Sequence, residues 1–395
     1  MNSTTVTPNL LDRMVAIRRD LHRHPELSWK EERTQSQIAS HLEKLGLVYR
    51  KIAGTGLIVD IPGLNPKAPI IALRADIDAL PVEEETGLLF ASTNNGVMHA
   101  CGHDGHTSML LGAADLLVHD ARKEISVRLL FQPAEETGDG AQRMIKEGAL
   151  DGVSMIFGGH VDRHYPLGSI AVTDGPVNAS ADTFTITIDG QSGHAARPHE
   201  TTDAVVVGSL LVMAIQTIVS REVNPAHPSV VTVGKFDAGT AENVIAGHAR
   251  LQGTIRAQDP EVRTFLHDSL KRVGASVGQL HGADIRVDIR NGPPAVINPP
   301  KPTALCRTAA TKVVGSGNVR AMEIANMGGE DFSYYMEQIP GCYVRFGTTT
   351  PECEPHPAHS SRFDFDEKVL GIGAAYFHAV VDTLNKEFSA PLKSP

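Results

Sequence analysis

Apolar positions along the chain recur with two different periods, and the change of period predicts where helices and strands lie. Apolar residues three and four positions apart predict amphipathic helices, and short apolar runs bounded by turn residues predict buried strands. On this basis we predict helices over 8–23, 30–45, 107–118, 202–220, 260–280, 302–314 and 366–388. We predict strands over 57–59, 70–73, 127–131, 155–157, 184–188, 230–236, 248–256, 285–290 and 342–346.

Three predicted strands of the first part of the chain are followed at once by carboxylate or imidazole side chains. They are 70–73 with Asp76 and Asp78, 127–131 with Glu135 and Glu136, and 155–157 with His160. In open α/β sheets, ligands bind at the carboxyl ends of the parallel strands. We therefore expect these side chains to meet in one crevice.

The middle of the chain has a different order of elements. From 184 to 290 the predicted order is strand, helix, strand, strand, helix, strand, which is the split βαβ or ferredoxin-like module. Gly and Pro residues near 175 and 293 suit its boundaries. We predict an inserted domain at 181–292 between catalytic-domain parts 1–180 and 293–395. Helix 202–220 is apolar around much of its circumference, so its outer face either meets a second subunit or packs within its own domain.

Charge and composition exclude several classes of protein. The 395 residues carry a net charge of −10, so nucleic acid and anionic membrane surfaces are not expected as partners. The apolar run 204–218 is shorter than the roughly 20 residues of a spanning helix. Four cysteines at irregular spacing favour a reducing compartment. The first residues lack the pattern of a secretory signal, and we expect a cytoplasmic protein.

The stretch Met98–His106 concentrates chemistry, with one thiol, three imidazoles and one carboxylate around Gly102 and Gly105. Glycine lets a chain turn tightly, so we interpret the stretch as a loop whose side chains converge. A metal site, a thiol nucleophile and an incidental polar loop all remain open at this point. The adjacent Glu135 and Glu136 favour the metal site, since one carboxylate can bind a metal while its neighbour acts as a general base.

Six segments of the sequence carry longer motifs that give further evidence about the family. They are Met98–Thr107 (MHACGHDGHT), Phe131–Glu136 (FQPAEE), Gly190–His199 (GQSGHAARPH), Asn243–Gly247 (NVIAG), Gly328–Phe332 (GGEDF) and His359–Asp364 (HSSRFD). In these segments the chain resembles the M20 metallopeptidase family, in the branch of hippurate hydrolases, auxin-conjugate amidohydrolases and related N-acyl-amino-acid amidohydrolases. The resemblance covers essentially the whole chain. It implies an α/β fold, with an αβα zinc-exopeptidase-like catalytic domain and an inserted ferredoxin-like (βαββαβ) lid or dimerisation domain.

The resemblance also implies a dinuclear site. Its metal ligands would be Cys101, His103, Glu136, His160 and His359, with Cys101 bridging where other branches use aspartate. Glu135 would be the general base and later the acid, and Asp78 would orient a ligand. His194 resembles the lid-domain histidine that reaches the oxyanion and that the dimer partner supplies in the family. Substrate-binding residues would be Asn243, Arg256, Gly328 and Gly329.

Some positions stay open. His99 and His106 are weaker candidates for metal ligation, and His356 competes with His359. The segment Asp162–His164 departs from the family pattern because it places charged residues directly after His160. This segment either binds a polar acyl group of the substrate or faces solvent.

Together these inferences predict metal-dependent hydrolysis of N-acyl amino acids of the hippurate, N-acetyl or indoleacetyl type to a carboxylic acid and a free amino acid. Two zinc or manganese ions are expected, with cobalt or nickel also able to occupy the site, and a homodimer or homotetramer through the inserted domain. A metallo-carboxypeptidase or dipeptidase would perform the same reaction on small peptides. Two competing hypotheses are a thiol hydrolase with Cys101 as nucleophile and His103 as base, and a metal-loaded binding protein without turnover.

Overall fold

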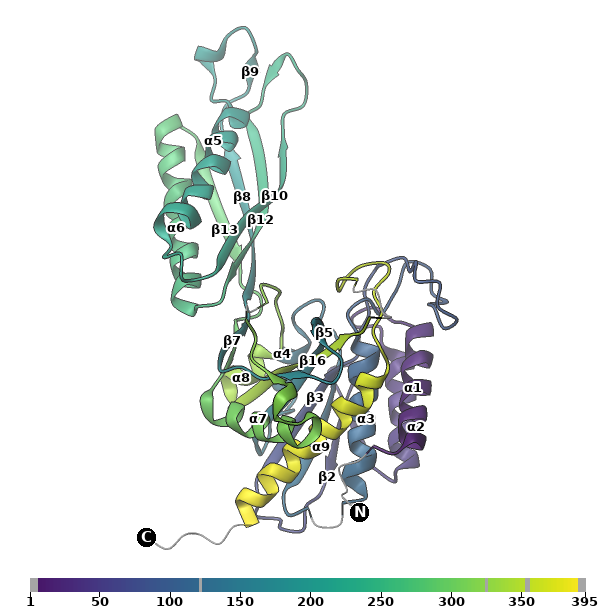
Figure 1. Ribbon diagram of the computed structural model, residues 1–395. Coiled ribbons are helices and arrows are strands. Elements are labelled where there is room, and N and C mark those ends of the chain that lie inside the picture. Colours follow the sequence, from purple (N-terminus) through teal and green to yellow (C-terminus); the bar gives the residue numbers. More distant parts are fainter. Residues whose placement is uncertain (1–5, 121–122, 324–325, 352–355, 390–395) are drawn as a thin grey trace, which may run out of the picture. The chain divides into compact units, whose positions relative to one another are not determined.

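The computed structural model describes residues 6–120, 123–323, 326–351 and 356–389 and forms two compact units (Figure 1). Unit 1 comprises Met1–Gly175, Ile297–Glu323 and Asp331–Pro395. Unit 2 comprises Pro176–Val296 and Ile324–Glu330. Unit 2 therefore contains the segment before Asp331 in addition to the insertion predicted at 181–292.

Unit 1 is built on an eight-stranded mixed sheet whose central strands β3, β4, β5 and β16 run parallel. The strands in spatial order are β1 (Tyr49–Ile52), β2 (Gly56–Ile61), β4 (Ser126–Gln132), β3 (Ile70–Asp76), β5 (Val153–Pro166), β16 (Gly341–Thr349), β6 (Ile170–Ala171) and β15 (Val319–Arg320). The sequence predicts only 155–157 of β5, and this is too short. The strand continues to Pro166 because β16 pairs with it over that length.

Seven helices of unit 1 are present in the described residues. They are α1 (Pro8–Arg23), α2 (Glu32–Lys44), α3 (His103–Val118), α4 (Gly140–Lys146), α7 (Pro300–Val314), α8 (Ser333–Gln338) and α9 (Lys368–Ser389). Helix α3 packs against α1 and α9, α7 packs against α9, and α4 packs against α8. The core of the unit lies between these helices and the sheet and is almost entirely aliphatic and aromatic.

Helix α3 begins at His103, four residues before the predicted start at 107. Gly102 precedes the helix with a φ of 92°, a conformation that glycine adopts at little cost. Gly105 is helical, and its role is close packing, because a Cβ there would lie 2.6 Å from the ring of Phe365. The interpretation of Met98–His106 as a loop throughout is therefore wrong for its second half.

Unit 2 has the predicted ferredoxin-like order. Its main elements are β8 (Ser180–Asp189), α5 (Ala204–Thr217), β10 (Ser229–Ala238), β12 (His248–Ala257), α6 (Pro260–His281) and β13 (Asp284–Arg290). The antiparallel sheet has the order β10-β12-β8-β13. Shorter strands are β7 (Gly175–Asn178), β9 (Gly193–His194), β11 (Val244–Ile245) and β14 (Val296–Asn298).

One helix in the described part of the chain, Ala204–Glu222, is long and apolar enough to cross a membrane by length and composition alone. From the sequence, the apolar run 204–218 is too short to span a membrane. The helix is longer than this run because the helical conformation continues to Glu222. A single helix of this kind is weak evidence for a membrane span, since core helices pass the same test. The inner residues Val207, Leu211 and Ile215 are buried in the core of unit 2.

Candidate metal centre and substrate-binding residues

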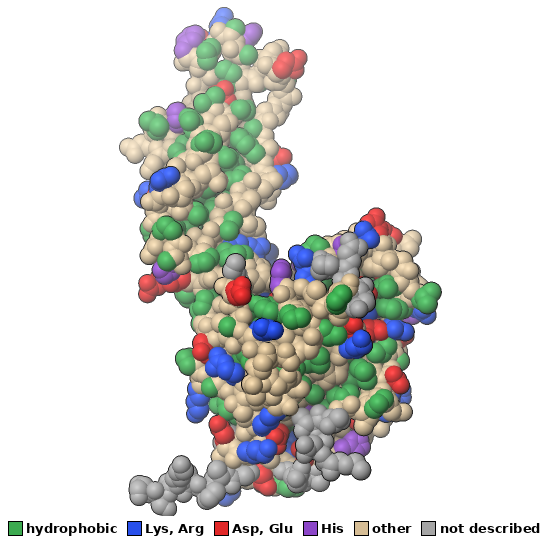
Figure 2. All heavy atoms as spheres, in the orientation of Figure 1, with side chains coloured by type: hydrophobic (Ala, Val, Ile, Leu, Met, Phe, Trp, Pro, Cys, Tyr) green, Lys and Arg blue, Asp and Glu red, His purple; other side chains and the backbone are tan. Residues whose placement is uncertain are grey.

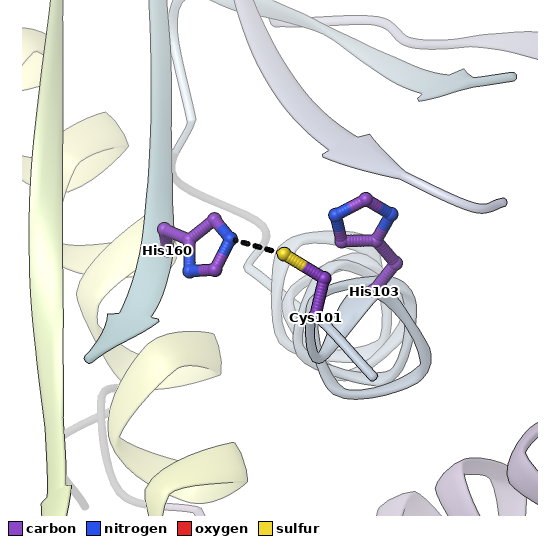
Figure 3. A group of neighbouring side chains, drawn as sticks. All are labelled: Cys101, His103 and His160. Carbon is purple, nitrogen blue, oxygen red and sulfur yellow. Dashed lines mark hydrogen bonds between the residues drawn. The ribbon is translucent and has the colours of Figure 1, made fainter. Parts of the chain in front are cut away.

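Of the five groups of metal-ligand type among the described residues, two share Cys101. One is Cys101, His103 and His160, and the other is Cys101, Glu136 and His359. In each group the three donor atoms lie within 4.8 Å of one another. Figure 3 shows the first group, in which His160 projects from a strand toward the Sγ of Cys101, 3.3 Å from its Nε2.

The local backbone explains how these side chains converge. His359 has a φ of 67°, and its N–H donates to the carbonyl of Ala100 at 2.7 Å, which ties its loop to the chain beside Cys101. Ala134 also has a positive φ, 55°, and its N–H donates to the Oε1 of the buried Glu31 at 2.9 Å. Non-glycine residues in this conformation are strained, and such strain concentrates at functional sites.

Asp78 orients His103. The Nδ1–H of His103 donates to the carbonyl oxygen of Asp78 at 3.0 Å and lies 3.2 Å from its Oδ1. This fixes the proton on Nδ1 and turns Nε2 toward the carboxylates of Glu136 and Glu135, at 3.8 and 3.9 Å. The other oxygen of Asp78 accepts the N–H of Glu136 and the hydroxyl of Ser28. A carboxylate that holds the second nitrogen of a ligating histidine is a common feature of metal sites.

Two buried polar atoms indicate that these residues fit metal ions. The Nε2 of His103 and the Oε1 of Glu136 have no hydrogen-bond partner among the described residues. A buried polar atom without a partner costs roughly 1–3 kcal/mol, so such atoms usually have a function. Sulfur, imidazole nitrogen and carboxylate oxygen are the donors that zinc and related divalent ions take. The residues fit two divalent ions.

Burial shifts the protonation of the donors in different directions. Burial lowers the pKa of His160, and partial desolvation with the nearby charge of His103 lowers the pKa of the more exposed His359, so both imidazoles are ready to bind a metal. Burial raises the pKa of Glu136 to about 7, and burial together with the charge of Glu136 raises the pKa of Cys101 well above its ordinary value. For His103 burial acts to lower the pKa, but Asp76 and Asp78 outweigh it and raise the pKa.

In unit 2 the predicted catalytic His194 and three of the predicted substrate-binding residues form two separate pairs. His194 and Asn243 lie together where β9 pairs with β11, since the N–H of Ala195 donates to the carbonyl of Asn243 at 3.2 Å. The guanidinium of Arg256 lies 3.4 Å from the place that a Cβ on Gly329 would occupy. Arg256 is near the far end of β12 from β11, and a strand rises about 3.3 Å per residue, so roughly 25 Å separates the two pairs.

The model of peptidase family M20/M25/M40 matches residues 72–383. The chain belongs to this family. N-acetyl-L-cysteine deacetylase from Bacillus subtilis is 42% identical over 368 residues, which are 92% of this chain and 86% of the deacetylase. IAA-amino acid hydrolase ILR1-like 2 from Arabidopsis thaliana is 40% identical over 377 residues, 93% of this chain and 84% of that protein.

Among solved structures, the Bacillus subtilis YXEP protein, a dinuclear metal binding peptidase of the M20 family, has a TM-score of 0.85 and 34% identity. The match covers 96% of this chain and 99% of that one. The predicted family and fold are confirmed, and the chain is an M20 amidohydrolase.

Three histidines of this M20 chain whose metal ligation the sequence did not decide lie outside the two groups that share Cys101. His99 is buried, has no hydrogen-bond partner among the described residues, and burial lowers its pKa to about 4. His106 uses both ring nitrogens in hydrogen bonds within the fold. His356 joins no donor group in the described part of the chain. Cys353 lies outside the described residues.

Two further features of the M20 site were not predicted from the sequence. Asp76, which the sequence analysis grouped with the other strand-end carboxylates without a role, binds Arg74 at 2.6 Å and His106 at 2.6 Å. In the divergent segment, Asp162 accepts the N–H and the Nδ1–H of the exposed His164, at 2.8 and 2.7 Å. The Asp162 charge therefore has a local partner on the same strand.

Proposed function

We propose that this amidohydrolase cleaves the amide bond of N-acyl amino acids to release a carboxylic acid and a free amino acid. The observation that carries the proposal is the pair of donor groups that share Cys101, with Glu135 beside them. The names of the deacetylase and of the IAA-amino acid hydrolase both describe removal of an acyl group from an amino acid or its derivative. This common chemistry supports the substrate class and leaves the acyl group to be measured.

The donor groups assign the metal positions in this proposal. Cys101, His103 and His160 would hold one divalent ion, and Cys101, Glu136 and His359 would hold the other. Thiolate ligation favours zinc over manganese, cobalt and nickel. Such ions supply Lewis-acid chemistry, which polarises the scissile carbonyl and makes a water molecule acidic.

Glu135 is the proposed general base. It follows directly after the strained Ala134 and, unlike Glu136, belongs to neither group that contains Cys101. Its Oε2 lies 3.9 Å from the Nε2 of His103, so the carboxylate faces the site. In the reaction, the Glu135 carboxylate takes a proton from the attacking water and passes it to the nitrogen of the departing amino acid.

Unit 2 supplies the proposed contacts with the substrate. The Nδ1 of His194 accepts the N–H of Ala196 at 3.0 Å, so the ring proton is on Nε2, which can donate to the oxyanion. The side chain of Arg256 is half-buried and its guanidinium makes no hydrogen bond with any described residue, so its fork suits the carboxylate of the amino acid. Asn243 and Gly328 complete this proposed set, with Asn243 beside His194.

The separation of the two pairs within unit 2 supports a dimer. Residues about 25 Å apart cannot touch one small substrate, so we propose that His194 and Asn243 act on a substrate whose carboxylate is held by Arg256 of another subunit. The outer side of α5 exposes Val205, Val206, Leu210 and Met213, and hydrophobic side chains are visible on the surface of unit 2 (Figure 2). An exposed apolar helix face of this kind suits a homodimer or homotetramer contact.

The test is hydrolysis of N-benzoylglycine, N-acetyl amino acids and indoleacetyl amino acids, with dipeptides as a comparison. Protein is measured as purified, after chelation, and after addition of Zn²⁺ or Mn²⁺. Glu135→Gln is compared with Glu32→Gln, which changes an exposed carboxylate on α2. We expect activity to disappear on chelation, to return with metal, and to be lost in Glu135→Gln while Glu32→Gln remains active.

Three results would overturn the proposal in distinct ways. Turnover that survives chelation but is lost on thiol alkylation would establish Cys101 as a nucleophile. Cleavage of dipeptides in preference to every N-acyl amino acid would establish a dipeptidase. Tight metal binding without turnover of any of these substrates would favour a binding protein.

A further inference from the structure

His106 lies in the first turn of α3, is buried, and faces β3 and β5. Its Nδ1 is 2.6 Å from the Oδ1 of Asp76, and its Nε2 accepts the backbone N–H of Val161 at 3.0 Å. Because a backbone N–H can only donate, Nε2 must be the unprotonated nitrogen, and Nδ1 carries the proton that Asp76 accepts. Both nitrogens are therefore occupied, although Asp76, His103 and His106 lie close enough together to resemble a metal site.

The hydrogen bond to Val161 replaces a missing strand. On one side β5 pairs with β16 as far as Pro166, but on the other side its pairing with β3 stops at Phe157. Beyond Phe157, the backbone of β5 has no strand beside it on the β3 side among the described residues. The ring of His106 provides the acceptor that a neighbouring strand would have provided for Val161.

The backbone of Val161, whose N–H and C=O both take part, in turn sets the direction of His160. The Nδ1–H of His160 donates to the carbonyl of Val161 at 2.6 Å, which leaves Nε2 facing the Sγ of Cys101 at 3.3 Å. The rings of His106 and His160 are also in edge-to-face contact, with centroids 4.6 Å apart. A continuous path of contacts thus runs from Asp76 through His106 and the backbone of residue Val161 to His160.

Asp76 is itself held in place. Its second oxygen accepts from Arg74 at 2.6 Å, and Arg74 is also paired with Asp331 at 2.9 Å. All of these groups are buried within unit 1. A hydrogen-bond network of this kind, with each member satisfied, rigidifies the groups at its end.

We propose that His106 is a positioning residue for metal binding: Asp76 holds its Nδ1–H, and its Nε2 fixes the backbone of Val161 and thereby the direction of the His160 imidazole. This inference rests on the proposed function, because it takes His160 as a ligand of one of two metal ions. Outer contacts of ligating histidines usually contribute tenfold to hundredfold to metal affinity.

Two substitutions separate the two hydrogen bonds of His106. The amide of glutamine in His106→Gln can place an acceptor near the position of Nε2, toward Val161. The shorter amide of asparagine in His106→Asn can place a donor near Nδ1, toward Asp76, but cannot reach Val161. His378→Asn is the matched control, since His378 is a buried histidine beside Asp120, at the opposite end of α3 from His106.

The measurement is titration of metal-stripped full-length protein with Zn²⁺ in competition with a chromogenic chelator. The absorption spectrum of the Co²⁺-loaded protein is recorded in parallel, because a thiolate and imidazole ligand set gives it a characteristic shape. We expect His106→Asn to weaken one of two Zn²⁺ by about 10- to 100-fold and to alter the Co²⁺ spectrum, while the other ion binds as in the wild type. We expect His106→Gln to recover most of the affinity and His378→Asn to bind both ions normally.

The outcomes distinguish this inference from the proposed function. If wild-type protein binds two ions and His106→Asn binds both with unchanged affinity, the positioning role is refuted. Equal losses in His106→Gln and His106→Asn would also refute it, because a general packing defect does not depend on which hydrogen bond is kept. If the wild-type protein binds no ions, the proposed function is refuted, and the positioning role that rests on it is refuted with it.

Discussion

Metal binding at neutral pH should release protons, and the structure gives their number. In metal-free protein, the raised pKa values keep Cys101 and His103 protonated at pH 7. Glu136, with a pKa of about 7, is half protonated there. The donors bind metal only as thiolate, neutral imidazole and carboxylate. His160 and His359 contribute no protons, since their lowered pKa values keep them neutral at pH 7.

The expected release is the sum of these three groups. Filling both positions at pH 7 should displace one proton from Cys101, one from His103 and half of one from Glu136, roughly 2.5 in all. Protons compete with the ions, so affinity falls as the pH falls. The logarithm of the overall binding constant should rise by about 3 per pH unit below pH 7 and by about 2 per unit above it.

Calorimetric titration of stripped protein with Zn²⁺ in buffers of different ionisation enthalpy measures this number directly. Cys101→Asp should lower the release by about one proton if aspartate at this position is already ionised at pH 7. Glu32→Gln, which changes an exposed carboxylate outside the donor groups, should leave it unchanged. Release of fewer than about one proton per two ions bound would refute the assigned protonation states of the donors.

Three other experiments test separate parts of the site. Glu31→Gln should lower the free energy of unfolding by about 2 kcal/mol, because Glu31 holds the N–H of the strained Ala134. Adding Ala134→Gly should restore part of the lost free energy of unfolding, because glycine adopts the positive φ of residue 134 without strain; an additive loss of stability in the double variant would contradict this reasoning. His99 has a pKa of about 4 when folded and 6.5 when unfolded, so stripped protein should lose up to about 3 kcal/mol as the pH falls from 6.5 to 4. In urea unfolding, the stability of His99→Leu should fall less between pH 6.5 and pH 4 than that of the wild type, by the amount assigned to His99. An unchanged pH dependence would refute the lowered pKa of His99. Arg256→Lys should raise KM about tenfold at similar kcat because lysine lacks the bidentate fork; a lower kcat at unchanged KM would place Arg256 in the chemical step.

The fold was predictable because its main signals are local. Helix α1 begins and ends where the apolar stripe predicts, with Pro8 in its first turn and the Thr7 hydroxyl capping the N–H of Leu10 at 3.2 Å. The alternation of the elements in unit 2 likewise gave the ferredoxin-like topology. The approximate meeting of Glu136 and His160 followed from the parallel direction of β4 and β5.

The start of α3 and the end of β5 were not predictable, because distant contacts decide both. Gly105 looks like a turn residue in the sequence, but the helix needs it to admit Phe365, which is far along the chain. The extension of β5 to Pro166 depends on β16, which is also remote in sequence. The role of His106 required knowing that the N–H of Val161 lacks a strand partner on one side.

Helix geometry explains why the histidines and the carboxylate of the Met98–His106 stretch do not all bind metal. Residues three apart in a helix share a face, so His103 and His106 both point toward the sheet, where one joins the donor groups and the other holds Val161. Asp104 is turned about 100° away, toward α1, where Arg18 and His22 bind it at 3.0 and 2.8 Å. Burial acts to raise the pKa of Asp104, but Arg18 and His22 outweigh it and lower the pKa. The carboxylate therefore anchors α3 to α1 and stays ionised without a metal, and the density of ligand-type residues in the motif overstates the number of ligands.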